Sequence, residues 1–282
     1  MSSTAPPPPP TTTPSLFDTT TLTSLASTVA ILLAALALSR RVLDPRATPA
    51  RLRALFVWHA FDALIHFLLE GSFVYHCLFS AAPVGSILTA SAAAGGAAGG
   101  GDGVTGTGMG TGAGYWPDPA NYLGGGGGGG LKGDGAVLVA HGPQAGGENP
   151  LAKLWMVYAR ADFRWAGVDL TVLSLEILTV LFAGPMACLV CYDIARKSPR
   201  ANLVMIILAT AELYGGYMTF MPEWLTANAN LDTSNFMYKW IFLVFFNGLW
   251  VVIPLYAIYV AADDIFDAFR VRATALGEKK AK

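Results

Sequence analysis

Ionisable side chains interrupt the apolar stretches of this sequence at regular spacings. One stretch carries Asp62, His66 and Glu70, which are four residues apart and therefore lie along one face of a helix. A histidine next to a carboxylate exchanges protons near neutral pH. An ionisable group inside a membrane-spanning helix costs about 2.5–3.5 kcal/mol on insertion scales, so several such groups in one chain indicate a functional site.

Later apolar stretches carry polar side chains at comparable positions. Glu176 and Thr179 are three residues apart, as are Asn247 and Trp250, so each pair shares a helix face. Burial favours the protonated form of a carboxylic acid, and an indole ring attracts cations. We expect these residues to surround one intramembrane pocket that suits acid-catalysed rearrangement of an apolar molecule through a carbocation. The other polar candidates on these stretches are Glu212 and Tyr214.

Several candidates also have a purely structural interpretation. Thr179 and Asn247, each taken alone, are residues that hold helices together by hydrogen bonding. Trp250 taken alone is a packing residue. Asp62 and its neighbour His59 lie near the expected cytosolic end of their helix, where contact with water would explain them. A histidine–glutamate pair that faces a second glutamate on another helix, in contrast, favours catalysis.

Membrane-spanning helices must position these residues. The chain has 282 residues, of which 54% are hydrophobic and 13% are charged, whereas soluble domains have about 25% charged residues. A spanning helix needs about 20 mostly apolar residues. The stretches that qualify are 22–38, 54–79, 168–192, 201–221 and 239–261. We therefore predict an all-α membrane protein with five transmembrane helices and an intramembrane pocket.

Composition also argues against several classes of function. The formal net charge of −1 provides no basic surface for nucleic acid. The cysteines, Cys77, Cys188 and Cys191, lie in apolar stretches and match neither a disulfide framework nor a zinc motif. We expect no metal and no cofactor. A transporter is disfavoured because the sequence has no visible internal repeat.

The chain divides into segments of different composition. We predict a disordered Pro/Thr-rich tail at 1–18, the first two spans at 19–79, and a flexible Gly/Ala-rich insertion at 80–150 with seven consecutive glycines at 124–130. An interface segment and the last three spans follow at 151–270, and a basic cytosolic tail at 271–282. In the interface segment, Trp155, Tyr158 and Trp165 are typical of a membrane–water boundary.

Lysine and arginine concentrate in the 1–2 connection, the 3–4 connection and the C-terminal tail. These segments lie on one side of a five-span chain, so the positive-inside rule predicts a cytosolic C-terminus. The chain ends in Lys279-Lys280-Ala281-Lys282, which is typical of the dilysine signal that returns membrane proteins to the endoplasmic reticulum. We expect a multi-pass protein of that membrane.

The motifs resemble those of the emopamil-binding protein family, the sterol Δ8–Δ7 isomerases of the EXPERA-type superfamily. The resemblance covers residues 54–270 apart from the Gly-rich insertion. It includes I-H-x-x-x-E-G on the second span, a stretch similar to Y-A-K-x-D-x-R, E-x-x-T…G-P on the third span, and an N-x-L-W motif on the fifth. These motifs stand at Ile65–Gly71, Tyr158–Arg164, Glu176–Pro185 and Asn247–Trp250.

The resemblance implies an enzyme that moves the sterol C8=C9 double bond to C7=C8 without a redox cofactor. A proton adds at C9, a cation forms at C8, and a proton leaves C7. It assigns proton transfer to His66, Glu70 and Glu176. It assigns contacts with the sterol or the cation to Thr179, Asn247, Trp250 and Tyr214. The implied partners are a sterol, membrane lipid and cationic amphiphilic amines as inhibitors; a homodimer is one alternative for the oligomeric state.

The fourth span departs from the family pattern. Where the family often has Q-x-Y-G-D, this chain reads Glu212-Leu213-Tyr214-Gly215-Gly216, so an acid replaces the glutamine and the aspartate is absent. Glu212 and Asp62 are therefore further candidates whose role, functional or structural, stays open. The departure supports an alternative in which the protein binds sterols or cationic amines without turnover, as the sigma-2 receptor type does.

Overall fold

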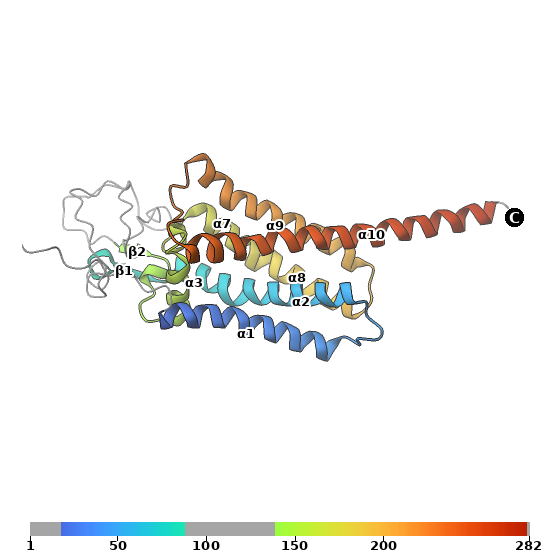
Figure 1. Cartoon of the computed structure of the whole chain (residues 1–282), viewed down its shortest axis with the longest axis horizontal. Coiled ribbons are helices and arrows are strands. Elements are labelled where there is room, and N and C mark those ends of the chain that lie inside the picture. The colour runs from blue at the N-terminus through green and yellow to red at the C-terminus, as the bar shows by residue number, and fades with distance from the viewer. Residues whose placement is uncertain (1–17, 88–138, 281–282) are drawn as a thin grey trace, which may run out of the picture.

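Five long helices dominate the computed structural model, which describes residues 18–87 and 139–280 (Figure 1). Each of them is long and apolar enough to cross a membrane. They are Thr19–Val42, Ala50–Phe79, Leu170–Ala195, Arg200–Leu225 and Met237–Gly277. The predicted all-α membrane fold with five transmembrane helices is therefore confirmed.

Three of these spans change their helical winding. The second consists of α2 (Ala50–Leu64), a π-helical segment (Ile65–Glu70) and α3 (Gly71–Phe79). The third consists of α7 (Leu170–Leu178), a π-helical segment (Thr179–Ala183) and α8 (Gly184–Ala195). The fifth begins with a π-helical segment (Met237–Phe246) and continues as α10 (Asn247–Lys280). π-Helical turns inside α-helices are frequent at functional sites, and each of these segments contains or adjoins a candidate residue.

The remaining spans, α1 (Thr19–Val42) and α9 (Arg200–Leu225), are α-helical throughout. Side-chain caps define where several helices begin. The Asp18 carboxylate accepts the Thr21 N–H at 2.7 Å before α1, and Asp169 accepts the Val172 N–H at 2.9 Å before α7. Asn149 caps the short helix α6 (Pro150–Tyr158) in the same way. The polar residues before these apolar runs therefore fix where each helix starts.

The bundle forms by contacts of α2 with α1 and α8, and of α9 with α8 and α10. The α1–α2 connection, the α8–α9 connection and the C-terminal part of α10 lie at one end (Figure 1). The strands, α6 and the α9–α10 connection lie at the other end. The three Lys/Arg-rich segments thus share one end of the bundle, as the predicted orientation requires.

The two described ends of the predicted insertion pair with each other. Strand β1 (Ala81–Pro83) pairs antiparallel with β2 (Val139–His141), with Ala82 opposite Ala140. Most of the predicted insertion, the predicted N-terminal tail and the last two residues of the Lys-rich end lie outside the described residues. Within the predicted basic tail, residues 271–280 are helical and continue α10.

The aromatic residues expected at the membrane boundary are turned inward. Trp155 and Trp165 are buried and stack with ring centroids 4.8 Å apart. Phe73 of α3 packs against both rings. The segments α6 and Phe163–Trp165 pack against α3 and bury these two rings. Their position at the membrane boundary stays a prediction.

Candidate functional site

His66 lies between two carboxylates on its own helix. Its Nδ1 is 2.5 Å from Glu70 Oε2, and its Nε2 is 3.1 Å from Asp62 Oδ1. The second contact is short enough for an ion pair but does not have hydrogen-bond geometry. His66 is 2% exposed and Asp62 is 0% exposed. The spacing seen in the sequence therefore corresponds to real contacts.

The solvated position expected for Asp62 and His59 was wrong. Both side chains are fully buried, and both ring nitrogens of His59 lack a hydrogen-bond partner among the described residues. The physical reason is lateral packing, because α1 and α8 pack against α2. Position along a helix does not reveal which neighbouring helices cover it.

The π turn that carries His66 and Glu70 is held from outside its helix. The Gly71 N–H bonds to the His66 carbonyl, which is the wide turn of a π segment. The Leu69 carbonyl accepts hydrogen bonds from Ser72 Oγ at 2.6 Å and from Trp155 Nε1 at 3.2 Å. These contacts link the winding at the site to α6.

The third span brings a second glutamate to the first. Thr179 Oγ1 lies 2.5 Å from Glu70 Oε2, to which it donates, and 3.4 Å from Glu176 Oε2. Glu176 is 7% exposed. A Cβ on Gly184 would meet the Phe67 ring at 2.9 Å, so glycine permits the close approach of the two spans here. Thr179 thus connects carboxyl groups from different helices.

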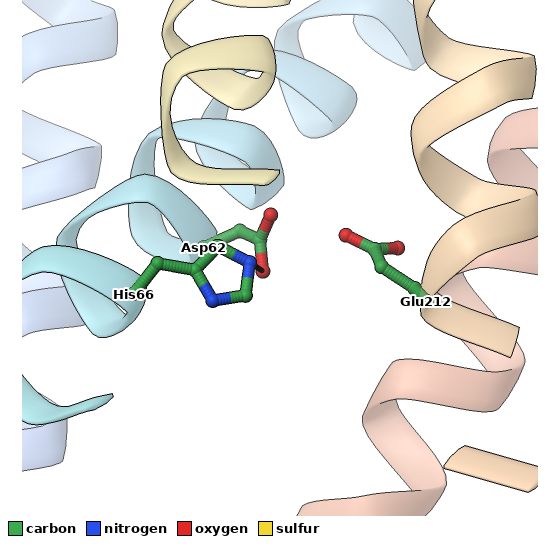
Figure 2. A group of neighbouring side chains, drawn as sticks. All are labelled: Asp62, His66 and Glu212. Atoms are coloured by element: carbon green, nitrogen blue, oxygen red, sulfur yellow. Dashed lines mark ion pairs between the residues drawn. The ribbon is translucent and has the colours of Figure 1, made fainter. Parts of the chain in front are cut away.

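Glu212 completes a group with Asp62 and His66. Figure 2 shows its carboxyl group pointing at that of Asp62 across the space between α9 and α2. Glu212 is 8% exposed, and neither of its oxygens has a hydrogen-bond partner among the described residues, nor has Asp62 Oδ2. On its other side, Asp62 Oδ1 accepts the Trp250 Nε1–H at 3.0 Å.

Asp62, His66 and Glu212 also lie close together. One side-chain nitrogen or oxygen atom from each lies within 4.8 Å of the others. The sequence analysis did not foresee this group, because Glu212 comes from a different helix than Asp62 and His66. The expectation of no metal stays a prediction.

Asn247 is close to the site but does not contact its carboxyl groups. Its Nδ2 donates to the Tyr158 hydroxyl at 3.0 Å and to the carbonyls of Phe242 and Leu243 at 3.0 and 2.9 Å. Burial raises the pKa of the Tyr158 phenol well above its ordinary value, so the hydroxyl is neutral. Asn247 therefore satisfies carbonyls of the π segment and ties the fifth span to α6.

Tyr214 lies apart from the cluster. It is 61% exposed on the outer face of α9. Two residues along a helix correspond to about 200° of rotation, so Tyr214 points away from the side that carries Glu212. A direct role for Tyr214 with the buried carboxyl groups has no support in this geometry.

The sequence interpretation missed the aromatic surroundings of Asp62. The Trp250 ring packs against Trp58 with centroids 5.2 Å apart and against Phe61 at 6.0 Å. The ring is thereby fixed while its N–H is aimed at Asp62. The available signal was the spacing of Trp58 and Asp62, one helical turn apart.

A second buried charged group lies at the end opposite the basic connections. Arg164 donates from Nε and Nη2 to the two oxygens of Asp162 at 2.9 and 2.6 Å, and from Nη1 to the Thr219 carbonyl at 2.8 Å. Glu223 lies 3.5 Å from Nη1 and accepts two hydrogen bonds from Asn230. Burial alone would lower the pKa of Arg164, but the Asp162 carboxylate outweighs it and the pKa lies above its usual range.

The site as a whole is rich in acids and poor in cations. Four carboxyl groups surround one imidazole, and no described lysine or arginine forms an ion pair with them. Such a set cannot be fully ionised in a buried position, because like charges would remain uncompensated. Protonated and ionised carboxyl groups side by side can both donate and accept protons. The arrangement supports acid–base chemistry on an apolar or cationic molecule.

The segment with the last three spans matches a known protein family. Residues 150–261 match the family EXPERA (EXPanded EBP superfamily). This segment contains Glu176, Thr179, Glu212, Asn247 and Trp250. The helix with Asp62, His66 and Glu70 precedes the matched segment, and the fold brings it to the others.

Curated relatives agree with that match. A 3-beta-hydroxysteroid-Delta(8),Delta(7)-isomerase from Cavia porcellus is 24% identical over 132 residues, which are 47% of this chain and 58% of the relative. A probable enzyme of the same name from Arabidopsis thaliana is 31% identical over 104 residues, 37% of this chain and 46% of the relative. An isomeliandiol synthase from Melia azedarach is 27% identical over 106 residues, 38% of this chain and 50% of the relative. The chain thus spans about half the length of the curated relatives it matches.

Proposed function

We propose that the chain is a sterol Δ8–Δ7 isomerase of the EXPERA superfamily, whose model residues 150–261 match. The observation that carries this proposal is the contact of His66 with Glu70 and Asp62, together with the hydroxyl of Thr179 between Glu70 and Glu176. These contacts connect proton donors and acceptors from two helices in one continuous series of side chains inside the protein. The curated relatives named as Delta(8),Delta(7)-isomerases supply the reaction.

The proposed reaction moves a double bond without net loss of protons. The C8=C9 electrons take a proton at C9 and leave a cation at C8. Loss of the C7 proton then forms the C7=C8 bond. An enzyme for this reaction needs an acid, a base and a means to stabilise the cation. We assign His66, Glu70 and Glu176 to proton transfer.

The cation would be stabilised by negative charge and by an aromatic face. The carboxyl groups around His66 supply the negative charge, and Trp250 supplies a ring held close to Asp62. Thr179 holds Glu70 in place through its hydroxyl. The same features would attract cationic amphiphilic amines, which would act as inhibitors by imitating the carbocation. The protein would work in the endoplasmic reticulum membrane with its C-terminus in the cytosol.

A second candidate function is binding without turnover. It is favoured by the acid at Glu212, which faces Asp62 where the resembling family often has glutamine. An additional carboxyl group would strengthen the binding of a cationic amine. It would also change the proton balance of the site. Both candidates predict amine binding, so product formation distinguishes them.

The test is expression in cells that lack their own sterol Δ8–Δ7 isomerase, followed by mass spectrometry of the sterols. We expect Δ7-sterols with the wild type and none with His66→Ala. A matched control is His76→Gln on the same span, whose side chain contacts Ser80 outside the cluster. Continued accumulation of Δ8-sterols in cells that contain the wild-type protein would contradict the isomerase and support the binding protein.

A further inference from the structure

The Asp62–Glu212 pair has no part in the proton transfer as assigned above. Both side chains are more than nine-tenths buried, and Asp62 Oδ2 and both Glu212 oxygens lack hydrogen-bond partners among the described residues. Their carboxyl groups point at each other from α2 and α9 (Figure 2). Unpartnered buried oxygens are costly, so the pair requires something between its members.

The surroundings of the pair do not provide a fixed positive charge. The titratable groups that face it are His59 and His66 from the second span, and Cys188 and Cys191 from α8. Glu70 adds further negative charge from the π turn. From α10 the pair receives the neutral N–H of Trp250. Two ionised carboxylates in this setting would repel each other without compensation.

We propose that Asp62 and Glu212 share one proton and that this pair acts as a proton reserve behind His66. A shared proton satisfies the unpartnered oxygens and removes one of the two negative charges, as in other carboxylate dyads. Of the two, Asp62 contacts the ring, at Nε2, whereas Glu70 contacts Nδ1. The pair thus lies on the opposite side of the imidazole from Glu70.

In this arrangement His66 lies between the Asp62–Glu212 pair and the carboxyl groups of Glu70 and Glu176. When the Nδ1–H proton passes to Glu70 on its way to the substrate, the Asp62 carboxyl group turns so that the oxygen that carries the shared proton faces Nε2, and the Nε2 lone pair takes this proton. The O–H bond of the pair breaks and an N–H bond forms, so the ring stays neutral. When the substrate gives up its C7 proton, the same steps run backwards and restore the pair. Asp62 and Glu212 are positioning residues, because they act on the substrate through His66.

The proton sharing is tested by infrared spectroscopy of the full-length protein at neutral pH, independently of activity. We expect the wild type to absorb as a protonated carboxyl group, with a shift in D₂O, and Glu212→Gln to lack this component. Thr210→Val, an exposed substitution on the same helix, is the control and should retain it. Identical spectra for wild type and Glu212→Gln would overturn the proposal. So would a stoichiometric metal ion that the wild type retains and Glu212→Gln loses.

The relay through His66 rests on the proposed isomerase function and has a separate test. Glutamine has the shape of glutamate but no proton to give, so Glu212→Gln should lower kcat by about tenfold or more and leave KM unchanged. The pH profile of kcat should lose one ionisation. Unchanged kcat and an unchanged pH profile would overturn the relay. If the wild type forms no Δ7-sterol, the isomerase proposal fails, whereas the infrared result still decides whether the proton is shared.

Discussion

The guanidinium of Arg164 and the imidazole of His66 are both buried among carboxylates, but the balance of charge differs. Arg164 makes a two-point contact with Asp162, and the other acid near it, Glu223, is satisfied by Asn230. His66 contacts Asp62 and Glu70, and two more acids, Glu176 and Glu212, lie next to those. The first group has two acids for one guanidinium and all of them are hydrogen-bonded, whereas the second has four acids around one imidazole.

This difference separates a structural from a chemical use of buried charge. The Arg164 group joins the turn after α6 to the end of α9, and backbone contacts of Phe163 and Asp232 extend that junction. Its hydrogen bonds are satisfied, so nothing in it needs to change. The His66 group leaves oxygens of Asp62 and Glu212 without partners. A polar network whose hydrogen bonds are all made stabilises the fold. A network in which buried oxygens have no hydrogen-bond partner is suited to bind a proton or a cation.

The largest expected effect lies in the acid-rich group. Glu176→Gln removes an ionisable group from the site and keeps its shape. We expect turnover to fall by about 10²–10⁴-fold, with the thermal unfolding temperature nearly unchanged. The measurement is sterol conversion by the purified protein, with Glu148→Gln, whose side chain is 93% exposed, as the control. A fully active Glu176→Gln variant would contradict a chemical role for the acid-rich group around His66.

Arg164→Ala is the corresponding test of the Arg164 group. Removal of Arg164 leaves Asp162 and Glu223 buried with uncompensated charge, which costs about 3–5 kcal/mol of stability. Thermal unfolding in detergent should show a large fall in the midpoint. Arg160→Ala provides the control, because its ion pair with Asp18 is about one-third exposed and is worth about 0–1 kcal/mol. Equal falls in the unfolding midpoint of the two variants would mean that the Arg164 group stabilises the fold no more than an exposed ion pair does.

Trp250→Phe tests the hydrogen bond that links α10 to Asp62 in the acid-rich group. Phenylalanine keeps most of the packing on Trp58 and Phe61 but removes the N–H that Asp62 accepts. We expect a loss of roughly 1–2 kcal/mol in unfolding free energy and a partial loss of turnover. Trp240→Phe, at a ring that is 48% exposed, should change neither quantity. No difference between these variants would show that the hydrogen bond to Asp62 is unimportant.

Ser72→Ala has the smallest expected effect and tests the support of the π turn. The change removes the hydroxyl that bonds to Leu69 O and to Trp155 Nε1. Loss of about 1 kcal/mol in stability is expected. Ser174→Ala removes a similar hydroxyl–carbonyl bond at an exposed position and should matter less. An equal or larger loss with Ser174→Ala would argue against a special role of the π turn.

Much of the fold followed from local pattern. Apolar runs of spanning length predicted the five helices, because a bilayer forces each segment to satisfy its own backbone groups. The spacing of His66 and Glu70 predicted their contact, since neighbours one turn apart meet on any helix. The π segments were not predicted, because their winding depends on partners outside the helix, such as Trp155 for the Leu69 carbonyl.

The sequence by itself determined the number of spans, the side on which basic residues gather and the residue types that could exchange protons. These follow from hydropathy, charge and helical period, which are properties of short segments. Tertiary structure alone decided that Asp62 is buried, that Tyr214 faces outward and that Glu212 meets Asp62. Rotation of a helix about its axis is set by the neighbours that pack on it, and 150 residues separate Asp62 from Glu212 along the chain.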